Sequence, residues 1–171
     1  MLQQFYPTMY SESAYAVDFQ TLYRKGYRGL LTDVDNTLVS HGAPSTGQSE
    51  AFFCHLRKMG WKTCIISNND EERVRPFAEA SGSLYVCHAG KPKTDGYRQG
   101  MELMETNRSN TVLLGDQMFT DIWGANRTGI KSILVKPVAR DYKVLILLKR
   151  AGESVVKRCY FRYARKHPGQ F

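Results

Sequence analysis

Residues 28–38 read Arg-Gly-Leu-Leu-Thr-Asp-Val-Asp-Asn-Thr-Leu, an apolar run that leads directly into two aspartates separated by one residue. A short apolar run bounded by polar residues is typical of a buried β-strand, and we expect one over residues 28–34. Runs of the same kind recur further along the chain and predict four more strands. These strands are residues 61–67, 83–86, 111–115 and 131–135.

Amphipathic segments separate the predicted strands. In residues 49–60, apolar side chains recur at three- and four-residue steps, which indicates a helix with Gly60 after its end. The other expected helices are residues 70–80, 94–107 and 119–128. Strands that alternate with helices predict an α/β fold, a three-layer, doubly wound parallel sheet with helices on both faces.

Polar side chains follow four of the predicted strands. In open parallel sheets, ligands bind beyond the carboxyl ends of the strands, because these ends meet at one edge of the sheet. We therefore expect the polar side chains to converge there and to form the functional site. The side chains placed in this way are Asp33, Asp35, Ser67, Lys91, Asp116 and Asp121.

Four carboxylates in one crevice repel each other and raise one another's pKa values, so they stay ionised together only around a cation. Their hard oxygen atoms favour Mg²⁺, whose remaining coordination positions go to water and to phosphate oxygens. Lys91 and Ser67 supply hydrogen-bond donors for a phosphate group. Asp33 is then suited to attack phosphorus, and Asp35 to protonate the leaving oxygen and later to activate water.

The same residues occur as four ordered motifs. They are Asp-Val-Asp-Asn-Thr at residues 33–37, Ser67, Lys91, and Gly-Asp at residues 115–116 followed by Asp121. In this order they resemble the haloacid dehalogenase (HAD) superfamily of phosphatases, over about residues 28–136. The residues of the motifs are similar to those of subclass IIIA, and specifically to those of the YqeG family, which is related to mitochondrial phosphatidylglycerophosphate phosphatases. Residues 7–10 and 22–26 also resemble the approach to the first strand in that family.

The resemblance implies that Asp33, Asp35 and Lys91 are the catalytic residues. Asp33 would be the nucleophile that forms an aspartyl-phosphate, and Asp35 the general acid and base. The implied ligands of the Mg²⁺ cofactor are Asp33, Asp35, Asp116 and Asp121. Asp35 would contribute its backbone carbonyl, whereas Asp121 could instead act through water or hold Lys91.

The implied substrate-binding residues are Thr37, Ser67, Asn68 and Lys91. Thr37 orients the loop after the first strand, while Ser67 and Lys91 hold the phosphate. For Asn68, a helix cap is an equally good interpretation. Lys93 is an alternative to Lys91, and we prefer Lys91 because Pro92 follows it, as in the family pattern.

We expect one HAD-like domain over residues 1–171. It would comprise an aromatic N-terminal extension at 1–27 that packs on the body, a catalytic core at 28–136 and a basic helical tail at 137–171. The segments 36–61 and 68–90 are filled by loops, single helices and a short strand, so neither has room for a lid domain. An open, capless site suits a large substrate that covers it, such as a lipid headgroup, a nucleic-acid end or a protein.

The positive charge is concentrated in the tail. Residues 1–135 hold 14 basic and 14 acidic residues, whereas residues 136–171 hold ten basic residues and two acidic ones, so the whole net charge of +8 lies there. This asymmetry suggests an anionic partner, either a membrane lipid or a nucleic acid, and the bland alternative is a solubilising helix. Residues 142–164 fit either an interfacial helix or a helix packed on the body, and we expect the active site itself to function without the tail.

These observations favour a Mg²⁺-dependent phosphomonoester hydrolase acting on phosphatidylglycerophosphate or another anionic phosphomonoester. One alternative is a phosphatase for nucleotides or nucleic-acid ends, since Tyr160, Phe161 and Tyr163 interleave with basic residues. A second is an adaptor of the same fold that binds an assembly through its tail. Residues 1–15 lack the basic and apolar segments of a secretory signal, so we expect a cytoplasmic protein that associates with membranes peripherally, with four reduced cysteines.

Overall fold

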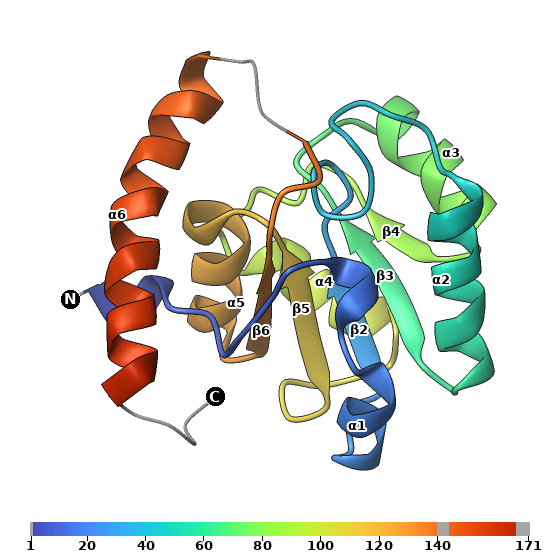
Figure 1. Cartoon of the computed structure of the whole chain (residues 1–171). Coiled ribbons are helices and arrows are strands. Elements are labelled where there is room, and N and C mark those ends of the chain that lie inside the picture. The colour runs from blue at the N-terminus through green and yellow to red at the C-terminus, as the bar shows by residue number, and fades with distance from the viewer. Residues whose placement is uncertain (1, 140–143, 167–171) are drawn as a thin grey trace.

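One sheet of six parallel strands organises the protein (Figure 1). The computed structural model describes residues 2–139 and 144–166, and in the last helix it describes the side chains from residue 151 onward. The strands are β1 (Met9–Ser11), β2 (Gly29–Thr32), β3 (Lys62–Ile66), β4 (Leu84–Val86), β5 (Thr111–Gly115) and β6 (Lys131–Val135), in the spatial order β1-β6-β5-β2-β3-β4. The predicted α/β fold is confirmed.

The central strands are mostly apolar because both faces of the sheet are covered. Leu31 of β2 pairs with Cys64 of β3 on one side and with Leu113 of β5 on the other. All three residues are fully buried. A parallel sheet covered by helices on both faces needs such continuous apolar runs rather than an alternation of polar and apolar residues.

Helices follow most of the strands. They are α1 (Phe19–Arg24), α2 (Gly47–Lys58), α3 (Glu71–Ser81), α4 (Asp95–Leu103), α5 (Trp123–Thr128) and α6 (Val144–Lys166). Short polar residues fix two of their starts, since Thr46 accepts the N–H of Ser49 before α2 and Asp70 accepts the N–H of Arg73 before α3. Two 3-10 segments, η1 (Leu2–Phe5) and η2 (Ala14–Ala16), lie near the N-terminus, and the π-helix η3 (Met118–Ile122) leads into α5.

The helices form two layers, one on each face of the sheet. Leu30 and Ile65 pack on one face with side chains of α1, α2 and α3. Their neighbours Leu31 and Cys64 point to the other face and pack with side chains of α4 and α5. The sheet therefore lies between two helical layers, as the sequence predicts.

The N-terminal extension takes part in the sheet as well as packing on the body. Residues 9–11 pair with β6 and form the edge strand β1, which the sequence analysis did not predict. Three half-buried residues are too few to show a periodic pattern. The expected aromatic packing is present, since the rings of Phe5 and Phe119 meet edge to face with centroids 5.1 Å apart.

No lid domain interrupts the strands around the site. Between β2 and β3 the chain forms a loop and α2, and between β3 and β4 it forms a short turn and α3. All of these residues are described by the structure. The site is therefore capless, as expected from the length of these segments.

Helix α6 packs along one side of the body. Its Val156 is buried in a cluster with Met118 and Ile122 of η3 and with Leu134 of β6. Of the two interpretations of this segment, packing on the body thus holds for one side of the helix; residues 142 and 143 of the expected helix lie outside the described residues. None of the described helices combines the length and the apolar character needed to cross a membrane.

Candidate active site

A tight turn at the end of β2 places two aspartates at the carboxyl edge of the sheet. The Asp33 N–H still donates to the Leu114 carbonyl oxygen of the neighbouring strand, at 3.0 Å. The chain then folds back, because the carbonyl oxygen of Val34 accepts the N–H groups of Thr37 and Leu38 at 3.1 and 2.9 Å. This turn lies at the point where the strand order reverses between β2 and β5, which is where open α/β sheets bind ligands.

Lys91 connects two of the predicted site residues. Its Nζ lies 2.6 Å from Asp33 Oδ1 and 2.7 Å from Asp121 Oδ1, and all three side chains are buried. Burial disfavours the charge on Lys91, but the two carboxylates outweigh it and raise the pKa of Lys91 above its ordinary value. Burial also raises the pKa of Asp33, against the opposing charge of Lys91, and the result is about 6.

A cluster of three buried carboxylates forms the floor of the site. Asp33, Asp116 and Asp121 each offer an oxygen atom, and these atoms lie within 4.8 Å of one another. The Thr37 hydroxyl lies between two of them, 3.1 Å from Asp116 Oδ1 and 3.4 Å from Asp33 Oδ2. One lysine balances only one of the three negative charges, so these hard oxygen atoms suit a divalent cation.

The side chain of Asp35 is separate from this cluster. Its Oδ1 accepts hydrogen bonds from Arg73 Nη2 at 2.7 Å and from the Gly42 N–H at 2.8 Å, and its Oδ2 accepts one from Asn69 Nδ2 at 2.7 Å. Burial alone would raise the pKa of Asp35, but the hydrogen bonds from Arg73 and Gly42 and the charge of Arg73 lower it below its ordinary value. The carboxylate of Asp35 thus lies apart from the carboxylate cluster that suits a cation. A contribution of the Asp35 backbone carbonyl to metal binding stays a prediction.

A cavity of about 180 Å³ adjoins the carboxylate cluster at Asp33. Its lining residues are Asp33, Asp35, Asn36, His41, Ser67, Asn68, Asn69, Lys91, Gln117 and Thr120. The expected lysine is the buried Lys91, whereas Lys93 is exposed and is not among the lining residues. Thr37, Asp116 and Asp121 are not among the lining residues.

Asn68 positions the loop that carries Lys91. Its Oδ1 accepts the Lys91 N–H at 2.7 Å, and its Nδ2 donates to the Lys91 carbonyl oxygen at 3.1 Å. The Ser67 Oγ accepts the Asn69 N–H at 3.2 Å, which leaves its hydroxyl hydrogen available as a donor in the cavity. The helix cap considered for Asn68 from the sequence is therefore wrong, since Asp70 caps α3. The predicted contact of Asn68 with phosphate stays a prediction.

The π-helix η3 fixes the position of Asp121. Its second oxygen, Oδ2, accepts the Gln117 N–H at 3.0 Å, and the Tyr97 hydroxyl donates to the Thr120 and Asp121 carbonyl oxygens at 3.0 and 3.2 Å. A Cβ atom on Gly115 would lie 2.5 Å from the Cβ of Asp121, so only glycine fits at the end of β5. The sequence leaves three roles open for Asp121: metal ligand, contact through water and contact with Lys91. The structure shows the contact with Lys91.

Several residues around the site were not predicted. Arg73 lies 38 positions from Asp35, and Tyr97 lies 24 positions from Asp121, so no local motif links either pair. Glu153 of α6 is buried and accepts the N–H of Phe119 at 3.1 Å, which attaches the tail to η3. The expectation that the active site functions without the tail stays a prediction, and this contact argues against it.

Comparison with known proteins agrees with this geometry. A family model described as HAD-hydrolase-like matches residues 88–141. The probable phosphatase YqeG of Bacillus subtilis (strain 168) is 32% identical over 166 residues, which cover 89% of this chain and 96% of that protein. The chain belongs to the YqeG family of HAD-type phosphatases. This YqeG-family protein is therefore an enzyme, a phosphatase.

A more distant relative is phosphatidylglycerophosphate phosphatase 1, chloroplastic/mitochondrial, of Arabidopsis thaliana. It is 24% identical over 154 residues, which cover 83% of this chain but 44% of that protein, so the YqeG-family chain spans less than half of its length.

Solved structures support the fold of this YqeG-family protein. An uncharacterized protein from Listeria monocytogenes serotype 4b aligns with a TM-score of 0.55 at 15% identity, over 77% of this chain and 99% of that one. The cobalt-bound deoxy-D-mannose-octulosonate 8-phosphate phosphatase of Haemophilus influenzae aligns with a TM-score of 0.53 at 11% identity, over 85% of this chain and 92% of that one.

Proposed function

We propose that this HAD-type phosphatase hydrolyses phosphomonoesters through a covalent aspartyl-phosphate on Asp33. The observation that carries the proposal is the position of Asp33, which lies at the floor of the cavity with one oxygen bound to the charged Lys91 at 2.6 Å. An ammonium group beside the nucleophile also attracts a phosphate, so Lys91 serves both to orient Asp33 and to bind the transferred group.

The proposed reaction has two steps. In the first, a carboxylate oxygen of Asp33 forms a bond to phosphorus and the ester P–O bond breaks. The leaving oxygen takes up a proton from Asp35, whose lowered pKa must first be raised by the negative charge of the phosphate bound beside it. In the second, water attacks phosphorus, Asp35 accepts the proton of that water, and the bond between phosphorus and Asp33 breaks to release inorganic phosphate. Ser67 and Lys91 donate hydrogen bonds to the phosphate in both steps.

We propose Mg²⁺ as the cofactor, held by Asp33 and Asp116 with Asp121 close by. The support is the carboxylate cluster, whose three oxygen atoms lie within 4.8 Å of one another and whose charge exceeds that of Lys91. When bound, a divalent ion supplies positive charge that offsets repulsion between the phosphate and the carboxylates. Thr37 holds Asp33 and Asp116 in their relative positions through its hydroxyl group.

For the substrate, we propose phosphatidylglycerophosphate or another anionic phosphomonoester, hydrolysed in the cytoplasm at a membrane surface. The cavity of about 180 Å³ is smaller than the roughly 300–1,000 Å³ that encloses a whole small ligand, so it takes in the phosphoryl end only. With no lid, the remainder of the substrate must exclude water from the site. The name of the Arabidopsis relative also supports a lipid phosphate.

Hydrolysis of nucleotides or of nucleic-acid ends is the alternative that the basic tail favours, and the adaptor alternative is disfavoured by the complete set of site residues. Purified protein should be assayed with Mg²⁺ for phosphate release from phosphatidylglycerophosphate in mixed micelles, from nucleoside monophosphates and from a 5′-phosphorylated oligonucleotide. We expect the highest kcat/KM for the lipid. A preference for the oligonucleotide would overturn the substrate proposal, and release of no phosphate from any of them would favour the adaptor.

A further inference from the structure

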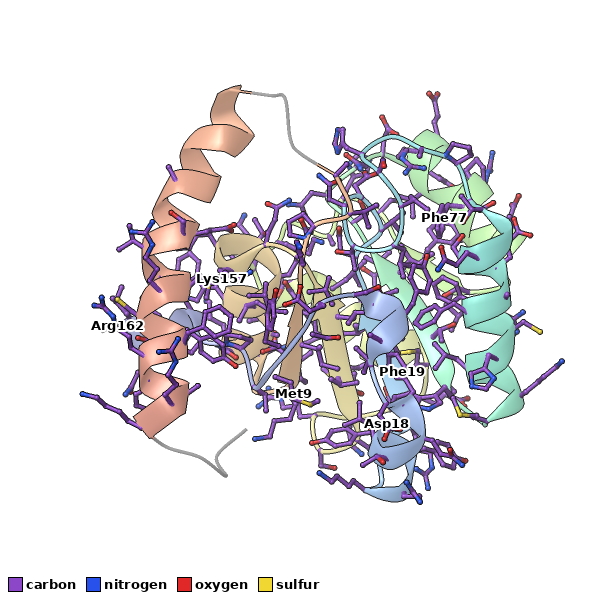
Figure 2. The ribbon with its side chains drawn as sticks, in the orientation of Figure 1. Met9, Asp18, Phe19, Phe77, Lys157 and Arg162 are labelled. Carbon is purple, nitrogen blue, oxygen red and sulfur yellow. The ribbon has the colours of Figure 1, made fainter. Side chains whose placement is uncertain are left out.

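The side of α6 that faces away from the body is strongly basic. With 100° of rotation per residue, Arg158, Arg162, Arg165 and Lys166 fall within an arc of about 100° on the helix. All four side chains are exposed. We call these four residues the basic face, and Figure 2 shows Arg162 on the outer side of the helix and Lys157 on the side toward the body.

No acidic residue neutralises the basic face in the part of the chain that the structure describes. Residues 154–166 contain no Asp or Glu, and the preceding acid, Glu153, is buried against η3. None of the four residues has a salt bridge with a described residue, whereas on the other side of the molecule Lys62 pairs with Glu105 at 2.6 Å. Uncompensated charge of one sign on a single face repels itself and attracts an anionic partner.

The aromatic residues of the tail are not part of this face. The rings of Tyr160 and Tyr163 pack against Tyr6, with centroids 5.6 and 5.5 Å away, and Phe161 packs against Tyr10 at 5.2 Å. Proteins that bind single-stranded nucleic acid stack bases on exposed aromatic side chains. The aromatic residues that support the nucleic-acid alternative in the sequence therefore pack α6 against the body.

Two features of the same helix favour a lipid surface instead. Val155 lies in the same arc as the basic face, and 57% of its surface is exposed. In addition, the sequence of α6 begins with five consecutive apolar residues, Val-Leu-Ile-Leu-Leu at 144–148. The exposed Val155 beside exposed basic residues matches the composition of helices that lie in the interface of an anionic membrane.

We propose that the basic face of α6 docks this protein on the surface of an anionic lipid membrane. Each basic residue near such a surface contributes a similar free energy of binding. Removing three of them should therefore weaken the partition of the protein onto the membrane by roughly 100-fold. Binding should also weaken as salt rises, because exposed charges are screened. The docking does not depend on the proposed substrate, since vesicle binding is measured without turnover.

The test uses the full chain with sedimenting vesicles of phosphatidylcholine, with and without phosphatidylserine, an anionic lipid that carries no phosphomonoester. The test variant is Arg158→Gln, Arg162→Gln and Arg165→Gln together. The control is Lys58→Gln, Arg98→Gln and Arg108→Gln, which removes the same charge from exposed positions elsewhere. We expect binding to phosphatidylserine vesicles by the wild type and the control, and its loss in the test variant.

Three results would overturn the proposal. The first is absence of wild-type binding to the anionic vesicles, and the second is an equal loss of vesicle binding in the test and control variants. The third is release of the protein from the vesicles by RNA at a lower concentration than is needed with competing lipid. Turnover of a small soluble phosphomonoester should be unchanged in the test variant, and its melting temperature should match that of the control. Failure of vesicle binding with intact turnover would refute the docking surface and leave the enzymatic proposal standing.

Discussion

Arg73 forms an ion pair with Asp35, with Nη2 2.7 Å from Oδ1, and the same nitrogen donates to the carbonyl oxygen of Ala43 at 2.8 Å. Arg73 lies on α3, whereas Asp35 and Ala43 belong to the loop after β2. A single guanidinium of α3 therefore holds two points of the loop that borders the cavity, the proposed acid and base Asp35 and the carbonyl oxygen of Ala43. Asn69 holds the second oxygen of Asp35, so its carboxylate has little freedom to turn.

We expect Arg73→Gln to lower kcat by about 10- to 100-fold with a smaller change in KM, because Asp35 would lose the contact that orients it. Arg73→Lys should restore little of the activity, because one ammonium cannot reproduce the planar geometry of the guanidinium. Arg75→Gln is the matched control, since Arg75 lies on the same helix and pairs only with exposed glutamates among the described residues. Wild-type kinetics in Arg73→Gln would remove Arg73 from the mechanism.

Asp33→Asn should abolish turnover, by about 10⁴-fold or more, because an amide cannot form the bond to phosphorus. The measurement is phosphate release together with trapping by beryllofluoride, which mimics a phosphoryl group on a carboxylate and should fail to bind the variant. Asp95→Asn, at an exposed position on α4, is expected to keep wild-type activity. Substantial turnover by Asp33→Asn would show that the nucleophile is another group or water.

Asp116→Asn should weaken Mg²⁺ binding more than Asp121→Asn does. Both oxygens of Asp121 already accept hydrogen bonds, from Lys91 at 2.7 Å and from the Gln117 N–H at 3.0 Å, so less of its charge is available to a cation. Calorimetric titration of each variant with Mg²⁺ gives the comparison directly. An unchanged affinity in Asp116→Asn would contradict its assignment as a ligand, and full wild-type activity in excess EDTA would contradict the need for a metal.

The affinity for Mg²⁺ should fall as the pH falls through about 6, the pKa to which burial raises Asp33. Above this pH Asp33 is ionised and binds the cation, whereas below it a proton competes for the same oxygen atoms. The expected loss approaches tenfold per pH unit below the pKa, measured by titration from about pH 8 to about pH 5. A constant affinity over this range would show that Asp33 does not change its charge there.

The sequence predicts those parts of the site that lie next to a strand end. Asp33, Ser67, Lys91 and Asp116 each follow a short apolar run, so topology alone brings them together. Contacts made from the middle of a helix have no such signal. Arg73 contacts Asp35 from 38 positions away in the sequence. Nothing in the sequence around Arg73 distinguishes it from a basic residue on the surface of a helix. The sequence likewise predicts one helix over residues 119–128 and not the π-helix η3, since the apolar residues there keep a helical pattern.

The tail of the protein gives the last prediction, which concerns its inner side. Glu153 is 6% exposed and accepts the Phe119 N–H at 3.1 Å, at the beginning of the π-helix that carries Asp121. Three residues further on, Val156 is buried among Met118, Ile122 and Leu134. The tail is thus bound to the segment that carries Asp121 by the Glu153 hydrogen bond and by the apolar contacts of Val156.

We therefore expect Glu153→Ala to lower both stability and turnover, because it removes the acceptor of the part-buried Phe119 N–H, at a cost of at most about 1–3 kcal/mol. Truncation after Val138 should have a larger effect, since it also exposes the apolar cluster around Val156. The measurements are the melting temperature and kcat for a small soluble phosphomonoester, with Glu102→Ala as an exposed control. The Gln variant of the basic face should change neither quantity, since its side chains point away from η3. If Glu153→Ala keeps the wild-type melting temperature and kcat, the inner side of α6 does not support the active site.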